Sequence, residues 1–286
     1  DRLQVRVDDP DGGNVDVSFR WRRQGAGAVN DAPAFTWVAI PDTQNYVSIA
    51  SQYRETIRAQ AQWIVDHRTD LKVALVSHLG DLTGQPDSRA QYTLVSDYLK
   101  VLDDAGVPNT VLPGNHDMDV ATGDAFLYDE YFPVTRYANA SWNSPTVRYG
   151  GYYGQNQFGP DAVDRKNKDS YVLLTAGGMD FLVLNLEFNP PDDVLDWAER
   201  VIDAHPDRRV MVATHNMLYP DGSLSASVRR PGGNDPEQIW SKLVAPNCRI
   251  FMVINGHNHT GDDGEAHTTK TNACGQPVQL ALSNYQ

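Results

Sequence analysis

Residues 35–46 read FTWVAIPDTQNY, an apolar run that ends abruptly and is followed by Asp42 and Gln44, two positions apart. Alternate residues of an extended segment point to the same side, so this carboxylate and this amide face the same way. Four later apolar runs of the chain also end in a short polar cluster. This recurring pattern, a buried strand followed by polar side chains, decides the fold and the site that we expect.

The five polar clusters contain carboxylates, amides and imidazoles, and glycines in three of them permit tight turns. In chain order the clusters are Pro41-Asp42-Thr43-Gln44, Gly80-Asp81, Gly114-Asn115-His116-Asp117, Thr214-His215-Asn216 and Gly256-His257-Asn258-His259. In open α/β sheets, ligands bind beyond the carboxyl ends of the strands. We therefore expect the clusters to meet at one edge of a sheet.

The rest of the pattern alternates predicted strands with predicted helices. We expect helices at 51–67, at 88–104 and from about 190 to 205, and strands at 35–40, 71–77, 107–112, 171–176, 179–186, 210–213, 250–254 and 278–282. The segment 137–169 lacks a clear period, so we expect it to be irregular. The order βαβαβ, followed by further strands and one helix, indicates an α/β domain with a mixed sheet.

Residues 1–32 differ from this pattern. They predict two alternating strands around an Asp-Pro-Asp-Gly-Gly turn, followed by a linker at residues 25–28. The pair resembles the last hairpin of an immunoglobulin-like β-sandwich repeat, and it fits an N-terminal hairpin of the main domain equally well. We therefore divide the chain into residues 1–32 and a main domain at 33–286, with neighbouring sandwich domains as candidate partners.

The 286 residues have a formal net charge of -13, and 41% of them are hydrophobic. A groove that follows a nucleic-acid backbone needs clustered Lys and Arg, which this acidic chain lacks, so we do not expect nucleic acid as a partner. No run approaches the roughly 18 apolar residues that a membrane helix needs, so we expect a soluble protein without a membrane span.

Cys248 and Cys274 are the only cysteines, 26 positions apart, and neither has the close partner of a zinc knuckle. They are either two buried thiols or a disulfide that joins the last strands, and a disulfide would imply an extracellular compartment. The chain starts at Asp1 rather than at Met, so we expect that a leader or a preceding domain has been removed.

Oxygen and imidazole donors that converge at strand ends suit hard or borderline divalent metals. Seven candidate ligands are more than one ion needs, so we expect two ions about 3.5–4 Å apart that share one carboxylate. The candidates are Asp42, Gln44, Asp81, Asn115, His215, His257 and His259. Each motif alone is common in turns, and only their conjunction points to a metal site.

The order D-x-Q, GD, GNHD, H and GHxH resembles the calcineurin-like metallophosphoesterase superfamily over residues 35–286. SHLGD and LPGNHD are similar to the motifs of its bacterial, often secreted, members. The resemblance implies a two-sheet β-sandwich flanked by helices, and a secreted hydrolase that cleaves a phosphate ester of a small substrate. The family usually continues with further strands, so we expect the main domain to be incomplete at its C-terminus.

The resemblance also implies a distribution of the ligands between two divalent ions, drawn from Mn, Mg, Fe and Zn. By position, one ion would be held by Asp42, Gln44, Asp81 and His259, and the other by Asp81, Asn115, His215 and His257. Gln44 stands where the family usually has a histidine. Its neutral oxygen is a harder and weaker donor than an imidazole, so we expect Mn²⁺ or Mg²⁺ at that site, with Mn favoured.

The mechanism that the resemblance implies uses a bridging hydroxide, which attacks phosphorus. His116 would protonate the leaving oxygen as general acid, an effect typically worth ~10²–10⁴-fold. The alternative for His116 is a structural hydrogen bond to its loop, and Asp117 is a candidate partner that supports it. Gly84 stands where the protein serine/threonine phosphatase branch has a supporting Asp, so that branch is not expected.

The motifs leave phosphomonoesterase and phosphodiesterase activity open, because both use the same ions and the same acid. A nuclease is disfavoured by the acidic charge, and a non-catalytic metal-binding domain in a multidomain secreted protein would not need His116. We expect His78 to pack near the site, and Glu187 either to line the cleft or to be structural. Candidate substrate contacts are Tyr131, Tyr137, Tyr152 and Tyr153.

Overall fold

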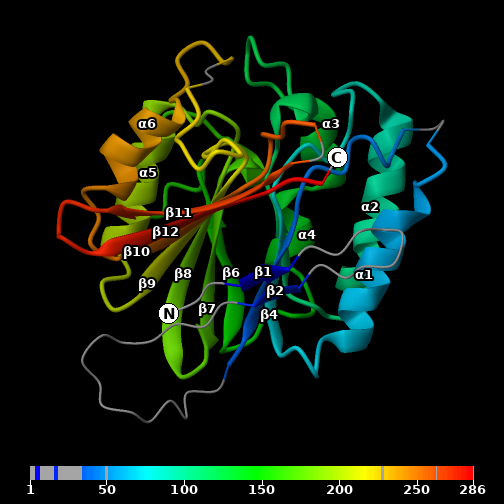
Figure 1. Cartoon of the computed structure of the whole chain (residues 1–286), viewed down its shortest axis with the longest axis horizontal. Helices are drawn as coiled ribbons and strands as arrows, with labels where there is room; N and C mark the ends of the chain where they lie inside the picture. The colour runs from blue at the N-terminus through cyan, green and yellow to red at the C-terminus, as the bar shows by residue number, and fades with distance from the viewer. Residues whose placement is uncertain are drawn as a thin grey trace.

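The main domain has four layers in the computed structural model, which describes residues 4–6, 16–18, 34–48, 51–226, 229–261 and 263–285. Two β-sheets pack face to face in the centre. Two long helices cover the outer face of the smaller sheet, and further helices cover the outer face of the larger one (Figure 1). This arrangement confirms the expected two-sheet α/β fold.

The smaller sheet contains three parallel strands in chain order: β3 (Thr36–Ile40), β4 (Val73–His78) and β5 (Asn109–Val111). All three strands point the same way, so the loops that follow them lie at one edge of the sheet. These loops contain the first three polar clusters of the sequence.

Helices α1 (Glu55–His67) and α2 (Arg89–Asp104) connect these strands and lie side by side on the right of Figure 1. In α1, the buried residues are Ile57, Ala61 and Ile64, whose spacing of four and three positions forms one apolar stripe. The stripe faces the sheet, and the opposite side of the helix is exposed.

The larger sheet has seven strands, which run from edge to edge in the order β11 (Glu265–Thr271), β12 (Pro277–Ser283), β10 (Ile250–Asn255), β9 (Arg209–Thr214), β8 (Met179–Leu186), β7 (Ser170–Ala176) and β6 (Val147–Tyr152). The inner strands β12, β10, β9 and β8 are parallel. The outer strands β11, β7 and β6 pair antiparallel with their neighbours. The sheet is therefore mixed, as the order of elements predicts.

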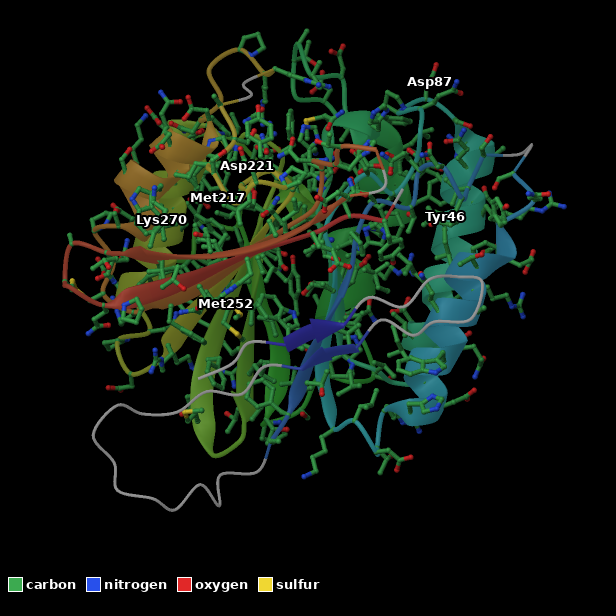
Figure 2. The ribbon with its side chains drawn as sticks, viewed as in Figure 1. Tyr46, Asp87, Met217, Asp221, Met252 and Lys270 are labelled. Atoms are coloured by element: carbon green, nitrogen blue, oxygen red, sulfur yellow. A yellow bond between two sulfur atoms is a disulfide. The ribbon has the colours of Figure 1, made fainter. Side chains whose placement is uncertain are left out.

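Two hydrophobic cores lie on the two faces of the larger sheet. Along β8, Val183 belongs to the core between the sheets, whereas Leu182 and Leu184 belong to the core beneath α5 (Asp192–Asp203) and α6 (Pro236–Ile239). Because successive strand residues point to opposite faces, a strand buried on both faces is continuously apolar. Figure 2 shows side chains filling the space between the layers.

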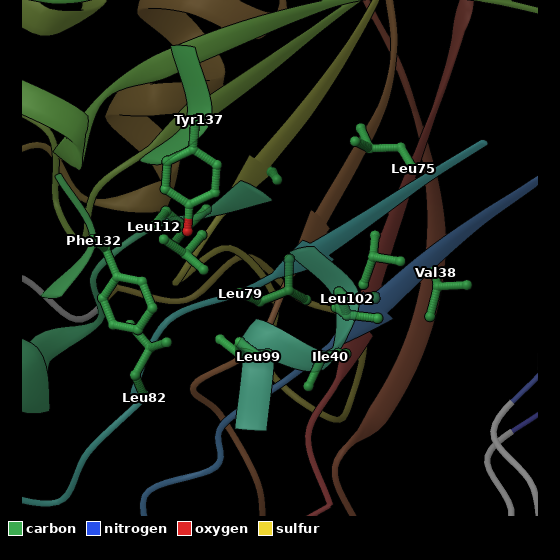
Figure 3. Close-up of a cluster of buried hydrophobic side chains, with 14 of the residues drawn as sticks. Val38, Ile40, Leu75, Leu79, Leu82, Leu99, Leu102, Leu112, Phe132 and Tyr137 are labelled. Carbon is green, nitrogen blue, oxygen red and sulfur yellow. The ribbon is translucent and has the colours of Figure 1, made fainter. Parts of the chain in front are cut away.

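The core between the sheets extends beneath α1 and α2. Figure 3 shows part of it, where Ile40 of β3 and Leu79 after β4 lie close to Leu99 and Leu102 of α2. At the same end of the molecule, the Tyr46 hydroxyl donates to the Tyr285 carbonyl at 2.8 Å (Figure 2). The loops that follow β3 and β4 therefore rest on the apolar core between the sheets.

Two strands of the larger sheet were not expected from the sequence. Strand β6 lies inside the segment 137–169, so the prediction of an irregular segment was wrong there. Strand β11 reads EAHTTKT and alternates between exposed and half-buried residues, without the apolar run of a buried strand. Two short helices, α3 (Phe126–Tyr131) and α4 (Val134–Ala138), were also missed.

Cys248 and Cys274 form a disulfide, with Cα atoms 5.6 Å apart, which decides between the two interpretations of these cysteines. Near the N-terminus, β1 (Gln4–Arg6) pairs antiparallel with β2 (Asp16–Ser18), in agreement with two expected strands. The expected linker at 25–28 lies outside the described residues, and the division of the chain at residue 33 stays a prediction. Among the described helices, none combines the length and the apolar character that crossing a membrane requires.

Candidate metal centre

The loops after the strands of both sheets meet at one edge of the sandwich. Within the smaller sheet, the Thr43 N–H after β3 donates to the Asp81 carbonyl after β4 at 2.9 Å. Between the sheets, the Phe188 N–H after β8 donates to the Pro113 carbonyl after β5 at 3.1 Å. The polar clusters of the sequence are therefore neighbours in space, as the pattern predicts.

Asp81 lies at the centre of this edge and is 2% exposed. Its Oδ1 is 3.3 Å from Nε2 of His215 and accepts the His116 N–H at 2.9 Å, and its Oδ2 accepts the Gln44 side-chain amide at 3.1 Å. One ligand atom each from Asp81, His215 and His257 lie within 4.8 Å of one another. Three predicted ligands thus offer donor atoms to a common point.

The buried His215 and the half-buried His257 approach each other through their ring nitrogen atoms. His215 Nε2 is 3.1 Å from His257 Nδ1 and 3.2 Å from Asn115 Oδ1, and His215 Nδ1 is 2.8 Å from the Leu79 carbonyl oxygen. In a neutral His215 that donates Nδ1–H to this carbonyl, Nε2 keeps a free lone pair. Three lone-pair donors then face one another, an arrangement that a bound cation satisfies.

Asp42 is fully buried, and both of its carboxylate oxygens accept the His257 N–H, at 3.1 and 3.0 Å. Gly256 makes this contact possible, because a Cβ at that position would lie 2.0 Å from Asp42 Oδ2. Gly114 does the same for Asp81, since a Cβ there would lie 2.1 Å from Oδ1. At these two positions only glycine lets the backbone approach the carboxylates so closely.

Three predicted ligands have left-handed backbone conformations, with φ angles of 25° at Asp42, 50° at Asp81 and 72° at His257. Such conformations cost non-glycine residues of order 1–3 kcal/mol each and persist only where the surrounding structure holds them. Strain of this kind gathers at functional sites, so its presence at three convergent side chains indicates a site rather than ordinary turns.

Burial and neighbouring charges shift the pKa values of these groups. Burial would raise the pKa of Asp81, but His215 and His116 lower it below its usual range. Burial would lower the pKa of His215, but Asp81 and Asp42 raise it to about 9. Burial, together with the charge of His215, lowers the pKa of His257 to about 3. Without a metal, His215 and Asp81 therefore form an ion pair, and a metal has to displace the His215 proton.

Gln44 supplies an independent sign that a cation fits this site. Its Nε2 donates to Asp81, but its Oε1 is buried and has no hydrogen-bond partner among the described residues. An unsatisfied buried acceptor costs about 1–3 kcal/mol, which a bound cation would remove. Carboxylate, amide and imidazole donors suit Mg²⁺ and first-row transition metals. The residues that fit such ions are Asp42, Gln44, Asp81, Asn115, His215 and His257.

His259, the seventh predicted ligand, does not belong to this cluster. Its ring is exposed, and its Nδ1 is 3.4 Å from the Gly261 carbonyl oxygen. The preceding Asn258 holds the loop by donating to Asn216 Oδ1 and to the Leu218 carbonyl, both at 2.8 Å. His259 would have to leave its present contact to bind a metal, and its role as a ligand stays a prediction.

His116 has its backbone at the centre of the site and its ring at the surface. The N–H donates to Asp81, whereas the exposed ring places Nδ1 3.2 Å from the Gly84 carbonyl oxygen. If Nδ1–H donates to that carbonyl, the second ring nitrogen is the one available to a substrate. The structural hydrogen bond expected as the alternative role is therefore present, and it leaves Nε2 for chemistry.

Asp117 is fully buried, and its carboxylate binds the backbone of two loops. It accepts the N–H groups of Leu82 and Thr83 at 3.0 Å each, and that of Gly114 at 2.8 Å. Asp117 therefore joins the loop after β4 to the loop after β5, a role that its sequence position did not reveal. Its expected support of His116 stays a prediction.

His78 packs beneath the site, as expected, and connects three segments. Its Nδ1 accepts the Gly80 N–H at 3.3 Å. Its Nε2 is 3.0 Å from Thr43 Oγ1. The Thr43 hydroxyl in turn donates to the Leu82 carbonyl at 3.1 Å. All three contacts are satisfied by a neutral ring with its proton on Nε2. Thr43 was missed from the sequence.

The tyrosines expected to contact substrate lie in different environments. Tyr137 and Tyr153 are 1% exposed and belong to the two hydrophobic cores, so the expectation is wrong for them. The hydroxyl of Tyr153 is bound to Asp193 at 2.9 Å. Tyr131 and Tyr152 are half-buried, and their contact with substrate stays a prediction.

Comparison with known proteins identifies relatives of this chain. The family model for calcineurin-like phosphoesterases matches residues 38–261. The uncharacterized protein YvnB of Bacillus subtilis (strain 168) is 29% identical over 260 residues, which cover 88% of this chain and 18% of that protein. This chain therefore spans about a fifth of the length of that curated relative.

Two solved structures align with most of this chain at low sequence identity. Purple acid phosphatase PPD1 from yellow lupin (Lupinus luteus) seeds aligns with a TM-score of 0.49 and 14% identity, covering 87% of this chain and 45% of that one. The protein TT1561 of Thermus thermophilus aligns with a TM-score of 0.44 and 11% identity, covering 87% of this chain and 88% of that one.

Proposed function

Because the chain belongs to the calcineurin-like phosphoesterase family, we propose that it hydrolyses a phosphate ester of a small substrate with the help of two divalent metal ions. The observation that supports this most is the convergence of buried donor atoms around Asp81, with Gln44 Oε1 buried and unpartnered beside it.

The residues that would hold the ions come from both sheets. Asp42, Gln44, Asp81 and Asn115 follow strands of the smaller sheet, and His215 and His257 follow β9 and β10. When bound, the ions would attract the phosphate and lower the pKa of a shared water so that hydroxide exists near neutral pH. The neutral oxygen of Gln44 in place of an imidazole supports Mn²⁺ or Mg²⁺ over Zn²⁺.

His116 is the residue that we propose as the general acid. Its backbone is fixed to Asp81, its Nδ1 faces the Gly84 carbonyl, and its ring is exposed at the mouth of the site. A protonated ring held in this way has its Nε2–H available to the leaving oxygen of an ester. Such a proton transfer typically contributes ~10²–10⁴-fold to the rate.

The test uses the metal-loaded protein with Mn²⁺, p-nitrophenyl phosphate and bis-p-nitrophenyl phosphate. We expect turnover of at least one substrate, and loss of turnover and of bound metal in Asp81→Asn. For His116→Ala with the metal retained, we expect a fall of ~10²–10⁴-fold on an ester with a poor leaving group, such as an alkyl phosphate, and a smaller fall on the nitrophenyl esters. Metal binding without turnover of either ester would favour a non-catalytic metal-binding domain. Full activity of His116→Ala on the ester with the poor leaving group would refute the acid role.

We further propose that the protein functions in an oxidising extracellular compartment. The disulfide between Cys248 and Cys274 supports this, because such bonds persist outside the reducing cytosol. Labelling of free thiols in protein isolated from its native source tests the proposal: we expect none, and two reactive thiols under denaturing conditions would contradict it.

A further inference from the structure

The segment after β9 carries two consecutive arginines, Arg229 and Arg230, to the rim of the metal centre. The Arg229 N–H donates to Asn189 Oδ1 at 3.3 Å. Asn189 directly follows Phe188, whose ring centroid lies 5.3 Å from that of His257 and 5.6 Å from that of His215. The Arg229 backbone is thus attached one residue away from a ring that packs on two predicted ligands.

Arg230 holds this segment in place through an ion pair with Glu187. Its side chain is 6% exposed, and its Nη1 lies 2.6 Å from Oε1 of Glu187, which is fully buried and also pairs with Arg165. Gly123 accommodates the guanidinium, because a Cβ there would lie 2.5 Å from Arg230 Nη2. Glu187 therefore has a structural role, which decides between the two functions expected for it.

Arg229 differs from its neighbour in being exposed. In the part of the chain that the structure describes, no carboxylate forms an ion pair with it, although the protein has 37 acidic residues. Its backbone is held at Asn189, next to Phe188, whose ring packs on His257. An arginine beside a metal centre that pairs with no carboxylate of the described residues is suited to bind an anionic substrate.

We propose that Arg229 is a substrate-binding residue that takes the terminal oxygen found in phosphomonoesters and lacking in diesters, so that the enzyme prefers monoesters. A monoester has three terminal oxygens and a diester has two. If each of two ions held one terminal oxygen, a monoester would keep a third oxygen for the guanidinium and a diester would keep none. The proposal rests on the phosphoesterase function proposed above.

The experiment compares Arg229→Ala and Arg229→Lys with Arg58→Ala, a control that removes an exposed arginine from α1. For p-nitrophenyl phosphate, we expect kcat/KM to fall roughly 10–100-fold in Arg229→Ala, as for loss of a charged hydrogen bond, with partial recovery in Arg229→Lys. For bis-p-nitrophenyl phosphate, we expect a fall of less than about threefold. Bound Mn²⁺ and the Arg58→Ala activities should not change.

A binding measurement separates this proposal from the function on which it rests. Inorganic phosphate, which has the same terminal oxygens, should raise the melting temperature of the Mn²⁺-loaded protein, and this shift should shrink in Arg229→Ala and not in Arg58→Ala. If neither ester is turned over, the phosphoesterase function fails while the phosphate shift still tests Arg229. Equal losses with both esters, or an unchanged phosphate shift, would overturn the role of Arg229.

Discussion

Individual residues of the site were predictable where the chain itself orders them. Asp42 and Gln44 were predicted from the alternation of an extended segment. In the structure β3 ends at Ile40 and Asp42 has a left-handed backbone, so that reason was wrong. Both residues nevertheless contact the predicted site: Asp42 through the His257 N–H and Gln44 through Asp81.

Asp117 was predicted as a partner of His116, but its bonds to the loop after β4 were not, nor was the contact of Thr43 with His78, because these partners lie elsewhere in the chain and become neighbours only when the loops meet. Sequence spacing therefore reveals ligand donors that lie on one segment. The hydrogen bonds between segments can be identified only in the folded structure.

His78 is a neutral imidazole buried between the loops after β3 and β4, and its protonation can be tested. Burial, with the charge of His215, lowers its pKa from 6.5 to about 3. Between these pH values the folded state binds fewer protons than the unfolded state. The contribution of neutral His78 to the free energy of unfolding is therefore complete above pH 6.5 and is lost as the pH falls toward 3. From pH 6.5 to 5 the loss should be about 2 kcal/mol, since one pKa unit corresponds to about 1.4 kcal/mol.

The measurement is urea unfolding at pH 7.5 and pH 5, in a chelator, for wild type and His78→Gln. Glutamine can still hydrogen-bond but does not titrate, so we expect the variant to be less stable at pH 7.5 and to lose about 2 kcal/mol less than wild type on acidification. His267→Gln on β11 is the matched control. Equal losses in wild type and His78→Gln would show that His78 does not contribute to acid lability.

In the larger sheet, the inner strands were predicted and the two edge strands, β6 and β11, were not. β8, β9, β10 and β12 are buried on both faces, so their sequences are continuous apolar runs. β11 lies at the edge and exposes alternate residues, so it resembles a polar loop in sequence. Its strand conformation depends on its pairing with β12, which no local pattern records.

The disulfide attaches the turn between β11 and β12 to the segment before β10. The Ala273 N–H also donates to the Ala245 carbonyl at 2.9 Å. β10 and β12 are parallel, and both cysteines precede them, so the disulfide lies at the end of these strands opposite the metal centre. It should therefore stabilise the hairpin without contributing to the chemistry.

We expect the double substitution Cys248→Ser with Cys274→Ser to destabilise the protein by about 3 kcal/mol, from the entropy of closing a loop of 26 positions. Urea unfolding with and without a reductant measures this: the reductant should destabilise wild type and leave the variant unchanged. Bound metal and hydrolytic rate should be retained by the variant. A variant that loses metal would contradict the separation of hairpin and site. A variant as stable as wild type would contradict the stabilising role of the disulfide.

At the scale of the whole molecule, the metal centre joins the two sheets. Asp42, Asp81 and Asn115 follow the smaller sheet, and His215 and His257 follow the larger one. In the absence of a cation, the two carboxylates and the facing ring nitrogens are held together mainly by the ion pair of His215 with Asp81. Metal ions that bind both sets of ligands would link the two sheets at this edge of the sandwich.

Metal binding should therefore stabilise the entire domain. At a free Mn²⁺ concentration 100 times the dissociation constant, one site adds about 2.7 kcal/mol to the free energy of unfolding. For a domain of this size that corresponds to a rise of roughly 5–10 °C in melting temperature, which scanning calorimetry with Mn²⁺ and then with excess chelator measures. Asp81→Asn, which removes the proposed bridging charge, should lose most of the shift, whereas the Cys→Ser double variant should keep it. Hydrogen exchange should slow in the loops of both sheets at this edge, and slowing confined to one sheet would show that the ions do not span the two.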